Sequence, residues 1–359
     1  MKSPQRAITM ITAAIAVLAP AAITATAAAS APSAGSTAQA VTAATRVTAT
    51  IPVGNEPYGV AANPRTDTIY VANVGGTTVS VISGRTNTVV ATVRVGRRPA
   101  GVAVNPRTDT IYVTNEKRRG TVSVISGRTN TVVATIRVGR APNGVAANPR
   151  TDTIYVANVA SGTVSVISGR TNTVLATVRV GGHFPVGVAA NPRTNTIYVS
   201  RAANIVTHGR VSVISGRTNT VVATVRVGSA PNGVAANPKT NTIYVTNGAS
   251  KTVSVISGRT NAVVATVRVG YPAAFGVAAN PRTNTIYVAN GGDETLAISG
   301  RTNTVVARVR VGSEPLGVAA DPKTDTIYVT NFGANTVSVL VSCRGRAAAS
   351  GSAARCRKG

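Results

Sequence analysis

A block of about 43 residues occurs seven times along this chain. Four short segments within the block alternate apolar and polar residues, a pattern typical of a β-propeller blade and not of a helical solenoid. The seven blocks therefore predict an all-β chain, a seven-bladed β-propeller of four-stranded antiparallel blades. Each block contains Thr-Ile-Tyr-Val, with its tyrosine at Tyr70, Tyr112, Tyr155, Tyr198, Tyr244, Tyr287 and Tyr328.

The block from Gly101 to Gly139 shows how one blade is built. Its predicted strands cover residues 101–105, 110–115, 121–125 and 131–138. Pro106 presets the turn between the first two strands, and we expect Gly127 to take a positive φ in the Ser-Gly-Arg-Thr-Asn turn between the last two. Valine, isoleucine and threonine dominate, and Gly or Pro recurs about every eight to twelve residues, which nearly excludes helix.

The last block lacks a fourth strand, and the start of the repeat region supplies one. Residues 336–340 match the third strand of a blade, but no Val-Val-Ala-Thr-Val-Arg-Val-Gly segment follows them. Residues 45–54 have the sequence of that missing strand. We therefore expect strand 45–54 to join the last blade and close the ring, which removes an unpaired edge.

The two ends differ in composition from the repeats. Residues 1–27 combine a basic start with an apolar run and resemble a secretory signal peptide, with a cleavage site after Ala27 or as late as Ala40. A membrane anchor is the alternative, but the run is short, alanine-rich and broken by Pro20, so we expect no transmembrane anchor after cleavage. The domains follow as signal peptide 1–27, disordered Ala/Ser/Thr leader 28–44, propeller 45–342 and basic tail 343–359. The protein is expected to be secreted, extracellular or associated with the cell envelope.

The chain has two cysteines, Cys343 and Cys356, and both lie in the basic tail. In an exported protein they could form one disulfide that closes a short loop outside the blades. Their spacing is no zinc motif, because four clustered ligands are missing. We expect neither a metal nor a cofactor.

The repeats predict two unlike faces. The turns between strands one and two (Asn-Pro-Arg/Lys-Thr) and between strands three and four (Ser-Gly-Arg-Thr) repeat almost letter for letter and share one face, here called the turn face. The other connections share the opposite face, here called the loop face, and they all differ, as residues 116–119 and 204–208 illustrate. A specific site is expected on the loop face. Drift in tolerant loops explains the same variation equally well.

Candidate binding residues gather in three groups on the loop face. The first is a basic patch made by Arg97, Arg98, Lys117, Arg118 and Arg119. The second is an acidic sector made by Asp293, Glu294, Glu314 and Glu56. The third comprises Tyr58, Phe275, Leu316 and Phe332, which could form an amphipathic mouth to the central channel. Solvated charges and loop anchors that pack locally are the alternative for each group.

The net charge of +27 suggests an anionic partner. Many cations repeat with the blades and must form rings, which attract polyanions such as an anionic envelope polymer, an acidic polysaccharide or nucleic acid. Non-specific nucleic-acid binding is possible, but few aromatics are available for base stacking. A basic protein without any partner is the alternative.

Catalytic constellations are missing from the sequence. The chain has two histidines, His183 and His208, and the block that contains them has no carboxylate. The acids at Asp67 and its equivalents alternate with asparagine from block to block, which suits a hydrogen-bonding turn residue and not a proton carrier. We therefore expect no enzymatic activity, with a lactonase-like or lyase-like enzyme as the least favoured alternative.

The repeated motif resembles the YVTN family of β-propeller repeats. Ile-Tyr-Val-Thr-Asn occurs at 111–115, 243–247 and 327–331, followed by Thr-Val-Ser-Val. The resemblance implies a seven-bladed propeller, usually exported, of the kind found in surface-layer and secreted proteins, one branch of which binds DNA. Related propellers include enzymes, but their catalytic and cofactor residues have no matching motif here. Val-Ser-Arg at 199–201 and Thr-Leu-Ala-Ile at 295–298 depart from the motif, so distortion of those blades is expected.

Together these features predict a secreted, non-catalytic, monomeric propeller that serves as a binding or cell-envelope module. Its partner would be a protein or an anionic envelope polymer. A DNA-binding or other polyanion-binding propeller is the alternative.

Overall fold

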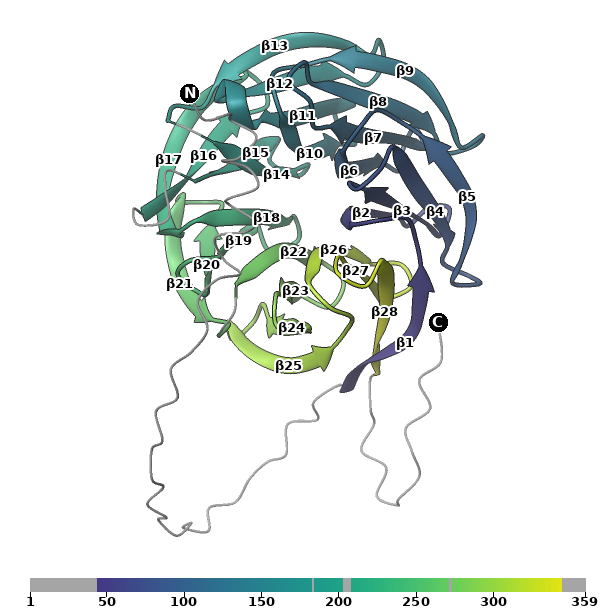
Figure 1. Ribbon diagram of the computed structural model, residues 1–359. Coiled ribbons are helices and arrows are strands. Elements are labelled where there is room, and N and C mark those ends of the chain that lie inside the picture. The colour runs from purple at the N-terminus through teal and green to yellow at the C-terminus, as the bar shows by residue number, and fades with distance from the viewer. Residues whose placement is uncertain (1–43, 183, 203–207, 271–272, 344–359) are drawn as a thin grey trace, which may run out of the picture.

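Seven four-stranded antiparallel sheets surround a common axis in the computed structural model, which describes residues 44–182, 184–202, 208–270 and 273–343 (Figure 1). The signal peptide, the leader up to residue 43, His183 and Cys356 lie outside these described residues, and Ala44, predicted as the end of the leader, begins the first strand. The predicted all-β, seven-bladed architecture is confirmed. No helix in the described ranges is long and apolar enough to cross a membrane.

The first three blades follow one another along the chain. Blade 1 comprises β2 (Pro57–Asn63), β3 (Thr68–Asn73), β4 (Thr78–Ser83) and β5 (Thr88–Arg94). Blade 2 comprises β6 (Pro99–Asn105), β7 (Thr110–Asn115), β8 (Thr121–Ser126) and β9 (Thr131–Arg137). Blade 3 comprises β10 (Pro142–Asn148), β11 (Thr153–Asn158), the short 3-10 helix η1 (Val159–Ser161), β12 (Thr163–Ser168) and β13 (Thr173–Arg179).

The other four blades complete the ring. Blade 4 comprises β14 (Pro185–Asn191), β15 (Thr196–Arg201), β16 (His208–Ser215) and β17 (Thr220–Ser229). Blade 5 comprises β18 (Pro231–Asn237), β19 (Thr242–Asn247), β20 (Thr252–Ser257) and β21 (Ala262–Arg268). Blade 6 comprises β22 (Ala274–Asn280), β23 (Thr285–Asn290), β24 (Glu294–Ser299) and β25 (Thr304–Arg310). Blade 7 comprises β26 (Pro315–Asp321), β27 (Thr326–Asn331), β28 (Thr336–Cys343) and, from the other end of the chain, β1 (Ala44–Pro52).

The ring closes through β1, as the sequence predicts. β1 pairs antiparallel with β28 (Figure 1), and in their register Ile51 lies opposite Val337. The Thr45 and Ser342 hydroxyl groups add a hydrogen bond of 3.2 Å. Blade 7 thus has the same four strands as the others, although its outer strand precedes the rest of the ring in sequence.

The apolar core lies between the blades. Val, Ile and Tyr side chains of the second and third strands pack against the inner strands of the next blade, as Tyr244 does in a cluster with Val277 and Val288. All seven repeated tyrosines are buried, with 0% or 1% of their surface exposed. Their equivalent positions between blades agree with their repetition in the sequence.

Two polar positions of the motif join strands and blades, and the second is polar only in blades 2, 4, 5 and 7, because blades 1, 3 and 6 have alanine there. In blade 2, Asn115 Nδ2 donates to the hydroxyls of Thr121 and Ser123, both at 3.0 Å, and so joins the second strand to the third. Thr114 joins neighbouring blades, because its Oγ1 accepts from the Gly101 amide at 2.8 Å and donates to the Asn143 carbonyl of blade 3 at 2.7 Å. Equivalent hydroxyl bridges are made by Ser200, Thr246 and Thr330.

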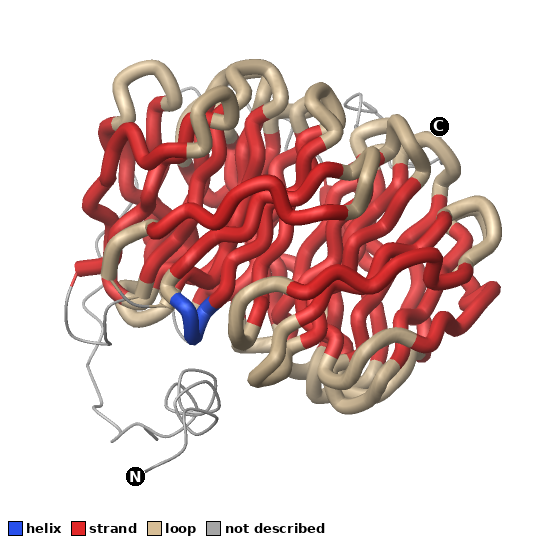
Figure 2. The backbone as a smooth tube through the Cα atoms, turned by 90° about the horizontal axis from the view of Figure 1, so that it is seen from above, coloured by secondary structure: helices blue, strands red, loops and turns tan. Residues whose placement is uncertain are grey.

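The turn between the third and fourth strands differs from the prediction in one detail. The left-handed residue is Asn130, with φ of 54°, and not Gly127, because asparagine tolerates that conformation. Gly127 has another role, since a Cβ there would lie 2.3 Å from Asp109 Oδ1. It is required for close packing of the two turns. The two faces that these turns and the variable loops form lie at opposite ends of the strands (Figure 2).

Candidate functional site

The turn face carries a repeated set of exposed cations. Each inner strand ends in an asparagine or aspartate that fixes the following turn, as Asn63 Oδ1 does by accepting from the Arg65 amide at 3.1 Å. The thirteen side chains that the turns present are all exposed. Those of the first turns are Arg65, Arg107, Arg150, Arg193, Lys239, Arg282 and Lys323, and those of the second turns are Arg85, Arg128, Arg170, Arg217, Arg259 and Arg301.

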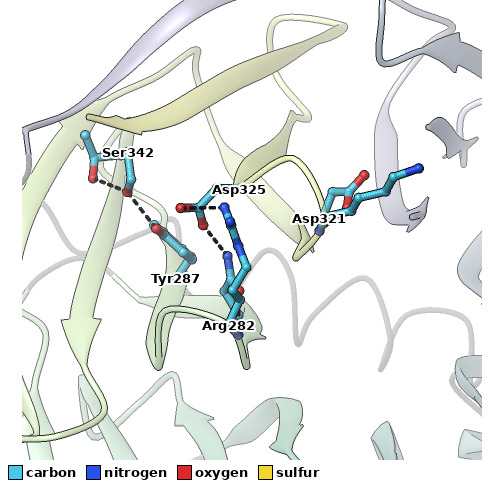
Figure 3. Close-up of polar contacts among 8 residues, drawn as sticks. Arg282, Tyr287, Asp321, Asp325 and Ser342 are labelled. Carbon is cyan, nitrogen blue, oxygen red and sulfur yellow. Dashed lines mark hydrogen bonds and ion pairs between the residues drawn. The ribbon is translucent and has the colours of Figure 1, made fainter. Parts of the chain in front are cut away.

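The acids of the turn face are held in contacts between blades. Asn63 Nδ2 donates to Asp109 Oδ1 of the next blade at 2.7 Å, and four further junctions repeat this contact with aspartate or asparagine as the acceptor. At the sixth junction Asp325 accepts from Asn280 at 2.6 Å and pairs with Arg282 at 3.1 Å (Figure 3). These carboxylates therefore neutralise little of the exposed positive charge.

The seventh junction, between blades 7 and 1, breaks this pattern. Asp321 stands where the other blades have asparagine (Figure 3), and it lies close enough to Asp67 of blade 1 for the two carboxylates to interact electrostatically. Asp321 is fully buried, and its Oδ2 and the Asp67 Oδ1 have no hydrogen-bond partner among the described residues. Burial raises the pKa of Asp321, and the negative charge of Asp67 raises that pKa further. The junction is thus a pair of facing carboxyl groups in place of an amide and a carboxyl group.

The predicted basic patch of the loop face comes together in blade 2. Arg97, Arg98, Lys117, Arg118 and Arg119 are all exposed, and the two loops join because the Glu116 amide donates to the Arg98 carbonyl at 2.9 Å. The Glu116 carboxylate lies 3.4 Å from the Arg98 guanidinium, with only 8% of its side chain exposed. Burial raises the pKa of Glu116, and Arg98 opposes that rise. One of the five charges of the patch is therefore paired.

The predicted acidic sector forms part of the ring closure. The Glu314 amide donates to Asp293 at 3.2 Å, which joins blades 6 and 7, and the Glu294 carboxylate pairs with Arg308 at 3.2 Å. The Glu56 amide donates to Asn335 of blade 7 at 2.8 Å. These residues support loops in addition to carrying charge.

The mouth of the central channel is a cavity of about 160 Å³ on the loop-face side. Tyr58, Phe275 and Leu316 line it, as predicted, but Phe332 does not. Tyr58 reaches over blade 2 to a hydrogen bond with the Asn143 side chain, and burial is the main cause of its raised pKa. The mouth is thus partly covered by one tyrosine.

The histidines form no described catalytic group. His208 is exposed on β16, opposite Ser229. Over the described ranges, no group of three or more His, Cys, Asp or Glu residues could hold a metal ion. The predicted pairing of Cys343 with Cys356 falls outside the described residues.

One notable residue was missed as a candidate. Arg201 replaces the motif asparagine of blade 4 and is buried, with 8% of its surface exposed. The sequence contains the signal, because Arg201 is where Val-Ser-Arg departs from the repeat. The predicted distortion is found on one side of blade 4. β15 keeps the regular register with β16, but β16 and β17 are longer than in blades 1, 2, 3 and 5, and their pairing has an extra register shift between His208 and Arg210.

Comparisons with known proteins agree with this architecture. A family model described as YNCE-like β-propeller matches residues 98–340. Among curated proteins, none matches this sequence. Of the solved structures, a chain of Kuenenia stuttgartiensis hydrazine synthase aligns with a TM-score of 0.74 and 21% identity, over 79% of this chain and 95% of that chain. At this level of identity, the likeness concerns the fold alone.

Proposed function

The chain belongs to the YNCE-like β-propeller family, and within that fold we propose that it is an exported, non-catalytic module that binds an anionic polymer of the cell envelope. The observation that carries this proposal is the turn face, where thirteen exposed cations recur with the blades. Such an array matches the regular charge spacing of a polymer better than it matches one small ligand.

The surroundings of these cations support the same function. Arg150 donates to the Arg193 carbonyl at 3.2 Å, and Arg193 donates to the Lys239 carbonyl at 3.0 Å, so these side chains lie along the ring from one turn to the next. The contacts leave the positive charges exposed, since a neutral carbonyl accepts each bond. A polyanion that follows the ring would meet cations from successive blades.

The test compares two variants that lose equal charge. The turn-face variant replaces by glutamine Arg85, Arg128, Arg170, Arg217, Arg259 and Arg301. The matched outer-strand variant replaces by glutamine six other arginines of the outer strands, Arg94, Arg137, Arg179, Arg268, Arg308 and Arg310. Fluorescence anisotropy with labelled polyglycerol phosphate measures the affinity at several salt concentrations. We expect the turn-face variant to bind about tenfold more weakly, or worse, with a shallower salt dependence, and the outer-strand variant to lose less.

Two results would oppose the proposal. Equal loss in the two variants would mean that net charge, and not the turn face, attracts the polymer. Single-stranded DNA of matched charge that bound the wild type about tenfold more tightly than polyglycerol phosphate would favour the nucleic-acid alternative.

Export is a separate part of the proposal, and it rests on residues 1–27. Mass spectrometry of protein recovered outside the cytoplasm of the producing cell should show a mature N-terminus at residue 28, or as late as residue 41. Full-length protein retained in the cytoplasm would contradict export and leave the binding test unaffected.

A further inference from the structure

At the loop-face end of each blade, three residues on the second, third and fourth strands lie side by side across the sheet, and blade 4 differs from the other blades in this row. In blades 1, 2, 3 and 5 this row reads asparagine, threonine, arginine, as in Asn115, Thr121 and Arg137. In blade 4 it reads arginine three times, because Arg201 is the partner of Arg210 and Arg210 is the partner of Arg226. Directly opposite residues of neighbouring strands share one face of the sheet, with Cβ atoms about 5 Å apart, and like charges there destabilise the sheet.

Arg201 is buried without a counter-charge. Its Nε has no hydrogen-bond partner among the described residues, and none of the described ion pairs involves the three arginines. The sequence has no acidic residue between Asp152 and Asp293, a stretch that contains all of blade 4. Burial lowers the pKa of Arg201, and the charge of Arg210 lowers it further. A buried guanidinium without an anion costs free energy, so this arrangement needs an anionic partner.

The loop above Arg201 leaves room for its guanidinium. Gly181 and Gly182 both have positive φ, 69° and 68°, and a Cβ on Gly182 would lie 3.1 Å from Arg201 Nη1. In blade 2 the glycine equivalent to Gly181 is Gly96, and it packs against the shorter side chain of Asn115. The Ser212 hydroxyl, whose equivalents accept from that asparagine, here donates to the Val180 carbonyl at 2.9 Å. The polar groups that engage the motif residue elsewhere are therefore turned away from Arg201.

We propose that Arg201, Arg210 and Arg226 form a binding site for one tetrahedral oxyanion, a phosphate or sulfate group, on the loop face of blade 4. Guanidinium groups present planar forks of N–H donors that match phosphate and sulfate oxygens. Three positive charges suit a dianion better than a monoanion. The site lies on the face opposite the turn-face cations, and it goes beyond the proposed binding of a polymer.

The test restores the blade 4 row to the motif. The double variant Arg201→Asn and Arg210→Thr recreates the asparagine and threonine of the other blades, so it is expected to fold. A matched control, Arg137→Gln with Arg179→Gln, removes the same charge from standard rows. Isothermal titration calorimetry measures binding of inorganic phosphate, sulfate, glycerol 1-phosphate and acetate at constant ionic strength, and thermal unfolding with phosphate provides a second readout.

We expect one phosphate or sulfate ion per chain to bind the wild type and the matched control about tenfold or more tightly than the double variant. Phosphate should raise the melting temperature of the wild type and not of the double variant. Tighter binding of glycerol 1-phosphate than of inorganic phosphate would identify a phosphate ester as the ligand, and the reverse order would identify the free ion. Binding of the double variant within about twofold of the wild type, no saturable binding by the wild type, or equal binding of acetate would overturn the site. The turn-face variant should keep phosphate binding, so this result and the polymer result are separable.

Discussion

Single polar residues decide how each blade is joined to the next. On the turn face an asparagine donates to an aspartate or asparagine of the following blade at six junctions, and in blades 2, 4, 5 and 7 a motif threonine or serine bridges a glycine amide to the neighbouring carbonyl. Both contacts are buried or half-buried, where an unmade hydrogen bond costs more than a made one contributes. The places where the residue differs are therefore the places where stability should respond to substitution.

Asp321→Asn should stabilise the protein at neutral pH. The amide would donate to Asp67, as asparagine does at the other junctions, and the free energy of unfolding should rise by about 1–3 kcal/mol at pH 7. Because burial raises the native pKa of Asp321, the folded chain binds this proton more tightly than the unfolded chain. The wild type should therefore lose stability as pH rises from about 4 through that raised pKa, and be unaffected by this group below about pH 4.

Urea unfolding from about pH 4 to about pH 8 measures the difference between Asp321→Asn and the wild type. The converse variant, Asn280→Asp, is a matched control, because it places a second carboxylate opposite Asp325 and should be destabilising at pH 7. A difference between Asp321→Asn and the wild type that stays constant with pH would contradict the carboxyl pair.

Thr246→Ala should weaken the junction between blades 5 and 6. The Thr246 hydroxyl accepts from Gly233 at 2.8 Å and donates to the Phe275 carbonyl at 2.6 Å, so its removal leaves two backbone groups without this partner. We expect a loss of about 1–3 kcal/mol in the free energy of unfolding, measured by urea denaturation. Thr246→Ser keeps the hydroxyl, as Ser200 does in blade 4, and should cost clearly less. Equal losses would assign the effect to the methyl group.

At the scale of elements, each outer strand is an exposed sheet edge, and a β-bulge in it hinders pairing with another chain. Each has a β-bulge, in which one residue has no partner on the third strand, such as Val90 between Val89 and Ala91. The bulge residues Val90 and Leu175 expose 58% and 61% of their surface. In β1 the bulge residue is Thr48. A bulge bends the edge and hinders pairing with another chain. This explains how so many apolar outer strands can coexist in one protein.

Removal of β1 should open the ring at blade 7. A chain that lacks residues 44–54 leaves the outer side of β28 unpaired and exposes the apolar residues that Ile51 covers. We expect lower stability and self-association through the β28 edge, measured by urea unfolding and by size-exclusion chromatography with light scattering. A synthetic peptide of residues 44–54 added in trans should restore the monomer. A shortened chain that stayed monomeric and as stable as the wild type would show that β1 is dispensable.

For the whole molecule, the sequence predicts the repeated strands and turns, but it does not predict the contacts that side chains make between strands, turns and blades. The strands, the two faces and the closure by β1 follow from period-two alternation and from one absent strand, both of which are local patterns. The sequence predicts a positive φ at Gly127, but Asn130 has it. Gly127 is needed instead because a Cβ added there would lie 2.3 Å from Asp109 Oδ1, a contact that only the folded structure shows. Arg201 and Asp321 stand out in the sequence only as departures from the motif. Their roles can be inferred only once the fold shows their neighbours, which are Arg210 on the next strand for Arg201 and Asp67 in the next blade for Asp321.

The charge of the whole molecule leads to a last prediction. A net charge of +27 produces repulsion that opposes the compact state, and the ring arrangement concentrates it on the turn face. The melting temperature should rise as NaCl increases from about 0.01 M to about 1 M, where the screening length falls from about 30 Å to about 3 Å. The turn-face variant, with six fewer charges, should melt higher than the wild type at low salt and converge with it at high salt. Differential scanning calorimetry measures both effects. A turn-face variant that melted below the wild type at every salt concentration would contradict the prediction, because it would mean that the arginines stabilise the turns by more than their mutual repulsion destabilises the fold.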